Sequence, residues 1–211
     1  MRIESFALGD FETNCYVLRD GDRPECLIID PGYEAGALVD FLDEEKLAPQ
    51  LILLTHGHCD HIAGLGLLRE RFGPVPVGIG REDAPMLTNP DLNLSALLGL
   101  PIYFAPAEQL YDAGAIIEAA GFRLAVLSTP GHTPGGISFY DAAAEAVFTG
   151  DALFAGSIGR HDFPGGNLEK LLYQIRAELL TLPENTRVYP GHGPVTSIRQ
   201  EKTANPFFQN R

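Results

Sequence analysis

Residues 51–61 read Leu-Ile-Leu-Leu-Thr-His-Gly-His-Cys-Asp-His, and this stretch decides the fold. The apolar run Leu51 to Leu54 has the length and flanks of a buried strand, and a helical pattern follows from about Asp60 to Arg71. Three imidazoles and a carboxylate therefore stand where a buried strand gives way to a helix. Such a cluster of nitrogen and oxygen ligands at this position predicts a metal site.

The spacing within the cluster indicates more than one ion. His56 and His58 are two residues apart on extended chain and point to the same side. Asp60 and His61 begin the next helix and can face back toward the same point. The arrangement can fill parts of two coordination shells at once.

Three later segments repeat one pattern: an apolar strand, a turn of small residues, and then a potential ligand. They are Leu124–His132, Ala146–Asp151 and Arg187–His192. If their strands share sheets with the first run, the carboxyl ends converge on one edge, where α/β proteins place reactive groups. Taken alone, a histidine after Pro-Gly is typical of a surface turn, and Asp151 could serve as a cap. The four segments together favour a common site.

Short strand-like runs alternate with amphipathic helices along the rest of the chain. Further strands are expected at Arg2–Phe6, Cys15–Leu18, Cys26–Ile29, Val75–Ile79, near Ile116, Phe122–Leu127, Gly136–Tyr140, Ala146–Phe148 and Arg187–Tyr189. Further helices are expected at Ala35–Lys46, Leu168–Leu180 and after Pro194, with a loop or short helix over one face at Thr88–Pro106. No linker separates these elements, which predicts a single domain over residues 1–211 with two packed sheets and outer helices.

Composition excludes several protein classes. At 211 residues with 45% hydrophobic content, the chain can bury a full core. Its 28 acidic against 15 basic residues give a net charge of -13, which predicts neither a nucleic-acid nor a membrane partner. Three cysteines at unrelated spacings suit free thiols, and the polar N-terminus does not resemble a signal peptide. These features predict a cytoplasmic protein and disfavour a secreted β-lactamase.

On these motifs the chain resembles the metallo-β-lactamase superfamily over essentially its whole length. The resemblance implies an α/β fold, a four-layer αββα sandwich, with two divalent metal ions at one edge. Zinc is expected, with iron or manganese as alternatives. The implied ligands are His56, His58 and His132 for the first ion, Asp60, His61 and His192 for the second, and Asp151 as the bridge. Asp30 resembles the acid that braces the histidine loop, with an ordinary turn aspartate as the alternative.

Within that superfamily, the segment Ser157–Phe163, the following Gly-Gly-Asn167 and the tail Glu201–Phe208 resemble the glyoxalase II-like branch. That branch hydrolyses hydroxyacyl-glutathione thioesters. Only 19 residues follow His192, so the match is to short members without the helical C-terminal domain that grips glutathione. The resemblance implies a hydrolase of S-lactoylglutathione-type thioesters, as a monomer or small homo-oligomer.

The expected mechanism uses a hydroxide that bridges the metals. Two cations about 3.5 to 4 Å apart lower the pKa of a shared water toward roughly 7. Asp60 is the expected catalytic residue that orients this nucleophile. A thiol with a pKa near roughly 8.5 leaves as thiolate without a strong general acid.

Alternative functions remain open from the sequence. A persulfide dioxygenase would bind a single iron through His56, His132 and Asp151, a set typical of non-haem iron oxygenases. Hydrolysis of lactones or other esters is possible on the same two-metal site. A non-catalytic binding module is expected to lose ligands, and this chain has lost none.

Four residues near the cluster invite separate interpretations. Arg160 and Asp162 are candidate substrate contacts, because a guanidinium can clamp a carboxylate, with a structural ion pair as the alternative. His161 is the one histidine without an expected metal role and should face solvent. Cys59 is expected to pack between the ligands.

Overall fold

The computed structural model describes residues 1–209, and most of its strands form two six-stranded sheets. The first sheet contains, in order, β1 (Arg2–Leu8), β2 (Thr13–Arg19), β3 (Glu25–Ile29), β4 (Ala48–Leu54), β5 (Val77–Gly80) and β6 (Gln109–Tyr111). The second contains, in order, β14 (Thr196–Ser197), β13 (Arg187–Pro190), β10 (Ala146–Gly150), β9 (Ile137–Asp141), β8 (Phe122–Ser128) and β7 (Ile116–Ala119). A separate hairpin consists of β11 (Leu153–Phe154) and β12 (Ser157–Ile158).

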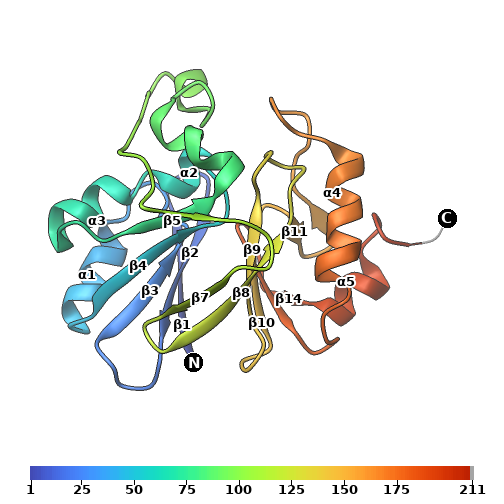
Figure 1. Ribbon diagram of the computed structural model, residues 1–211, viewed down its shortest axis with the longest axis horizontal. Coiled ribbons are helices and arrows are strands. Elements are labelled where there is room, and N and C mark those ends of the chain that lie inside the picture. Colours follow the sequence, from blue (N-terminus) through green and yellow to red (C-terminus); the bar gives the residue numbers. More distant parts are fainter. Residues whose placement is uncertain (210–211) are drawn as a thin grey trace.

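Helices cover the outer faces of both sheets (Figure 1). The α-helices are α1 (Gly36–Glu44), α2 (Cys59–Ile62), α3 (Leu65–Phe72), α4 (Leu168–Gln174) and α5 (Ile198–Ala204). Two 3₁₀ segments, η1 (Arg81–Thr88) and η2 (Ser95–Leu98), and one π-helical turn, η3 (Ile175–Leu179), complete the helical elements. With α1 and α3 on one side and α4 and α5 on the other, the expected four-layer αββα sandwich is confirmed.

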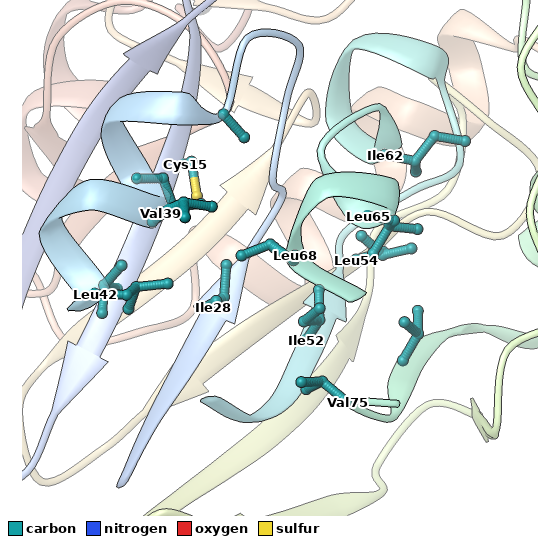
Figure 2. Packing of buried hydrophobic residues seen from close by; sticks show 14 of the residues in the cluster. Cys15, Ile28, Val39, Leu42, Ile52, Leu54, Ile62, Leu65, Leu68 and Val75 are labelled. Atoms are coloured by element: carbon teal, nitrogen blue, oxygen red, sulfur yellow. The ribbon is translucent and has the colours of Figure 1, made fainter. Parts of the chain in front are cut away.

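The central strands are apolar on both faces because both faces are buried. In β4, Ile52 and Leu54 pack under the helices, whereas Leu51 and Leu53 face the second sheet. Figure 2 shows the first of these layers, in which Val39 of α1 and other helical side chains pack over the strands. Successive side chains of a strand point to opposite faces, so a continuous apolar run is what a doubly covered strand requires.

Strand direction brings the ends of distant segments to one edge of the sandwich. Strands β3, β4 and β5 are parallel, and β10 is parallel to β13. Strands β8 and β10 are both antiparallel to β9 and so share a direction. Two backbone hydrogen bonds join the sheets at this edge, from Ile137 N to Thr55 O at 2.9 Å and from Asn14 N to Gly191 O at 2.7 Å.

Several element boundaries differ from the sequence prediction. The helix expected from Asp60 to Arg71 is broken into α2 and α3, because the Gly64 N–H donates to Pro31 O instead of continuing the helix. The expected helix Leu168–Leu180 changes from α to π geometry after Gln174. The sequence analysis did not predict β6, β11, β12 or β14, which have only two or three residues each. No helix within residues 1–209 has the length and apolar character that a membrane span needs.

Candidate metal centre

The seven side chains that the sequence analysis named as ligands lie together at this edge. They form three overlapping groups whose ligand atoms lie within 4.8 Å of one another: His56, His58 and His132; Asp60, His61 and His192; and His56, His61 and Asp151. The first two groups coincide with the two expected ligand sets. The third connects them.

Asp151 lies between the two ligand sets. Its Oδ1 is 3.3 Å from His61 Nε2, and its Oδ2 is 3.5 Å from His132 Nε2 and 3.6 Å from His192 Nε2. One carboxylate thus faces a histidine of the first group and two of the second, which is the geometry that a bridging ligand requires.

Four of the five histidines are oriented through Nδ1. His132 Nδ1 donates to Arg160 O at 2.7 Å and His192 Nδ1 donates to Phe11 O at 3.0 Å. His61 Nδ1 lies 3.0 Å from Asp30 Oδ2, and His56 Nδ1 lies 3.1 Å from the hydroxyl of Thr55. Because Nδ1 is engaged, Nε2 of each ring is presented to the centre. His58 is turned the other way, with Nδ1 2.9 Å from His132 Nε2.

The chemistry of this cluster fits bound cations. Among the described residues, the buried Nε2 atoms of His56 and His61 and Oδ1 of Asp151 have no hydrogen-bond partner. A buried polar atom without a partner costs about 1–3 kcal/mol, and the three residues that carry these atoms form one of the groups within 4.8 Å, so they fit coordination of a cation. Imidazole nitrogens and carboxylate oxygens suit zinc and other first-row divalent metals. The cluster is therefore a divalent metal site.

Burial and mutual contact set the protonation of the ligands. Burial, with the neighbouring His61, holds the pKa of His56 well below its ordinary value. Burial, reinforced by His132, lowers the pKa of His58 to about 3. Burial works against ionisation of Asp151, but His61, His132 and His192 together outweigh it and hold the pKa of that carboxyl below its ordinary range. Burial also works to lower the pKa of His61 and of His192, but Asp60 and Asp151 outweigh it and raise both. Neutral imidazoles and charged carboxylates are the forms that bind metal, so a cation would displace a proton from these two rings.

Asp30 connects the ligand loop to β3. Its carboxylate accepts hydrogen bonds from the Thr55 N–H at 2.8 Å and the Thr55 hydroxyl at 2.6 Å, besides its contact with His61. Asp30 has a φ of 52°, in the left-handed region, which aims its side chain across the sheet edge at the loop. These contacts are the ones that a bracing acid would make.

The structure also shows a second bracing acid that the sequence analysis missed. Asp83 is fully buried, and its carboxylate accepts from the Thr133 hydroxyl and the Gly135 N–H, each at 2.6 Å. Burial raises its pKa, while these bonds oppose that rise. Asp83 thus joins the loop of His132 to η1. Its neighbours Arg81 and Glu82 are typical of an exposed charged turn, so no local pattern indicates a buried acid.

Arg160 and Asp162 form an exposed ion pair with two hydrogen bonds of 3.0 Å each. Arg160 also lies over the ring of Phe163 at 4.1 Å and lines the cavity beside the metal centre. His161 is half-buried and its Nδ1 is enclosed, so the prediction that it faces solvent was wrong. Cys59 is buried, and its N–H donates to Asn93 O at 2.9 Å.

A cavity of about 430 Å³ opens beside the seven side chains. His58, Asp60, His132, Asp151 and His192 contribute to its lining, so ligands of both groups border it. A small molecule bound in this cavity would contact the metal centre directly.

Comparison with known proteins agrees with this geometry. Residues 8–192 match the family model described as the metallo-beta-lactamase superfamily. The chain belongs to this superfamily. It is 41% identical to "Probable metallo-hydrolase YqgX" of Bacillus subtilis, over 99% of this chain and 98% of the relative. It is 38% identical to "Hydroxyacylglutathione hydrolase GloC" of Haemophilus influenzae, over the full length of both.

Solved structures of the superfamily extend the comparison. The BLEG-1 B3 metallo-beta-lactamase has a TM-score of 0.94 and 42% identity, covering 99% of this chain and all of that one. TTHA1623 in a di-iron-bound form has a TM-score of 0.84 and 36% identity, covering 98% of this chain and all of that one. The protein is therefore a metallo-hydrolase of the metallo-β-lactamase superfamily.

Proposed function

We propose that this metallo-hydrolase cleaves thioesters of the S-lactoylglutathione type at a centre of two divalent cations. The observation that carries the proposal is the pair of ligand groups connected by Asp151 at the side of a cavity of small-molecule size. The 38% identity to a hydroxyacylglutathione hydrolase supports the thioester. Zinc is the first candidate metal, and the di-iron-bound relative supports iron as the alternative.

The residues of the site would have two roles, which are to bind the metal ions and to orient the reactants. His56, His58 and His132 would hold one ion, Asp60, His61 and His192 the other, and Asp151 both. Divalent cations held there lower the pKa of water toward about 7 and polarise a carbonyl.

We propose that Asp60 orients the attacking water. Its Oδ2 lies 3.2 Å from His192 Nε2 and accepts from the Thr13 hydroxyl at 3.1 Å. Thr13 is completely buried, so this hydrogen bond fixes the direction of the carboxylate. Burial opposes ionisation of Asp60, but His61 and His192 outweigh it and keep its pKa below the ordinary range. Asp60 borders the cavity as a charged acceptor at neutral pH and can hold a water proton there.

The side chains that line the cavity suit a thiolate leaving group. Among the described residues, the cavity lining contains no lysine or tyrosine. A thiol with a pKa near about 8.5 leaves as thiolate without a strong acid, whereas an amine or alkoxide does not. The lining therefore favours thioesters over amides and simple alkyl esters.

The test is a purified-protein assay with S-lactoylglutathione, following thiol release before and after chelation and again after zinc or iron is restored. We expect release that is lost on chelation and regained with metal. No release from metal-replete protein would remove the thioester proposal and leave the metal centre standing.

The same purified protein can be assayed for two alternative functions. A mononuclear-iron persulfide dioxygenase would use only His56, His132 and Asp151, and would consume oxygen with glutathione persulfide. The unpartnered His61 Nε2 argues for a second ion instead. β-Lactam or lactone hydrolysis is tested by adding a chromogenic cephalosporin and a lactone, because BLEG-1 is named a metallo-beta-lactamase.

A further inference from the structure

The cavity beside the metal centre has an apolar wall that the proposed chemistry does not explain. Besides the metal ligands, it is lined by Leu94, Leu97 and Leu98 and by Phe11, Phe154 and Phe163. We call these six side chains, with the space between them, the apolar pocket.

Two of the three leucines of the apolar pocket, Leu97 and Leu98, are exposed. Leu97 is 75% and Leu98 45% exposed, in a short segment where Leu100 is also 64% exposed. Single exposed apolar residues are ordinary, but several together beside a cavity mark a binding surface. Exposure of leucine side chains to water is unfavourable in free energy, and contact with an apolar ligand would remove this cost.

This segment is held firmly against the metal centre. Asn93 is completely buried, and its side-chain amide donates to Met86 O and Ile102 O, each at 3.0 Å. Its Oδ1 accepts from the Ser95 N–H at 3.0 Å, and its backbone O accepts from the Cys59 N–H. The turn that carries Leu97 and Leu98 is thereby fixed next to the ligand loop. A fixed surface can select among ligands.

The aromatic side of the apolar pocket touches the ligands themselves. The ring of Phe163 lies 5.8 Å from that of His58, edge to face, and the ring of Phe154 lies 6.1 Å from that of His192. An apolar group in the pocket would therefore sit directly beside the position of a carbonyl at the metals.

The lining offers few charged side chains besides the candidate metal ligands. Among the described residues, Arg160 is the only lysine or arginine in the lining, and its Nε and one Nη already bond Asp162. The carboxylates there, Asp60 and Asp151, belong to the candidate ligand groups. Away from the metal centre, a glutathione moiety, with two carboxylates and an ammonium group, would find only this one cationic side chain, which already holds Asp162.

We infer that the apolar pocket binds the acyl chain of the substrate and that this chain is apolar and longer than lactoyl. The inference rests on the proposed thioester hydrolysis and names its substrate class. The cavity volume of about 430 Å³ exceeds what a lactoyl group fills. The polar thiol half of the thioester would extend into solvent.

The first experiment measures binding without turnover. Acyl hydroxamates from acetyl to octanoyl anchor a carbonyl group at bound metal and direct the chain as an acyl substrate would. For zinc-loaded protein, we expect calorimetric affinity to rise about three- to fourfold per methylene up to hexanoyl, as each CH₂ leaves water.

Variants of the pocket leucines test whether the dependence of affinity on chain length arises in the apolar pocket. Leu97→Ser and Leu98→Ser should each weaken hexanoyl hydroxamate about fivefold or more and leave acetyl hydroxamate within about twofold. Leu100→Ser is the control, because Leu100 is exposed in the same segment but does not line the cavity. An affinity independent of chain length, or a rise that both pocket variants preserve, would overturn the inference.

A parallel series of N-acetylcysteamine thioesters, acetyl to octanoyl, separates this inference from the proposed function. We expect kcat/KM to rise with chain length in step with hydroxamate affinity. Cleavage of all thioesters at one rate, with flat hydroxamate affinities, would overturn the inference alone. Rising affinities without cleavage of any thioester would overturn the proposed function and leave the apolar pocket as a binding site.

Discussion

At the scale of single residues, the metal centre depends on contacts behind the ligands. His132 and His192 are aimed by backbone carbonyls of Arg160 and Phe11, which belong to distant parts of the chain. His61 is aimed by Asp30. Rings held in this way lose little freedom when an ion binds, so the protein has met part of the entropic cost of binding during folding.

Asp83 provides a residue-scale prediction. Asp83→Ala leaves the buried Gly135 N–H and Thr133 hydroxyl without an acceptor, so we expect the free energy of unfolding to fall by about 2–3 kcal/mol in urea denaturation. Zinc affinity should fall with it, because the loop of His132 loses its anchor. Asp112→Ala, which removes only an exposed ion pair with Arg81, should cost less than about 1 kcal/mol. Equal losses in the two variants would show that Asp83 braces nothing.

The sequence identified the candidate ligands and Asp30, but not the second supporting acid, Asp83. Each of the seven stands in a motif that can be recognised locally, such as a histidine after Pro-Gly at the end of a strand. Asp83 and Leu97 belong to no such motif. The roles of Asp83 and Leu97 depend on contacts with residues that are distant in the sequence. These contacts form only when the sheets pack together, so no local pattern predicts them.

At the scale of elements, the site depends on strand ends that come unusually close. A Cβ on Gly191, just after β13, would lie 2.2 Å from Asp151 Oδ1 and 2.7 Å from His61 Cε1. Glycine at this position lets the backbone after β13 pass directly behind two ligands. The metal centre can therefore be compact only because this residue has no side chain.

Gly191→Ala tests that requirement. We expect the variant to fold, since its φ is not in the left-handed region, but to lose at least half of its bound zinc by elemental analysis. The control is Gly36→Ala, where a Cβ meets nothing within 4 Å and alanine favours the start of α1. Full zinc occupancy in Gly191→Ala would contradict the close packing of ligands described here.

Elements with a strong period were predictable and short ones were not. The strand at Leu51 to Leu54 was predictable, because a strand that is buried on both faces needs an unbroken run of apolar residues. The break at Gly64 was not predictable, because it depends on a hydrogen bond to Pro31 O from a residue that also fits a helix. Strand β6 exists only through its pairing with β5, and its three residues carry no period of their own.

At the scale of the whole molecule, the ligands come from both sheets. The loop after β4 supplies four of the seven, and the strand ends of the second sheet supply His132, Asp151 and His192. The apolar contact between the sheets is set by Leu53, Phe139 and their neighbours, and it fixes how closely the loop after β4 approaches the ligands of the second sheet. Ions bound between them stabilise the folded state over the unfolded chain.

The most direct test is anomalous diffraction from crystals of the zinc-loaded protein. The account predicts two peaks about 3.5 to 4 Å apart, flanking the carboxylate of Asp151. One should lie among His56, His58 and His132, and the other among Asp60, His61 and His192. A single peak at full occupancy, or peaks away from these side chains, would contradict the two-ion centre.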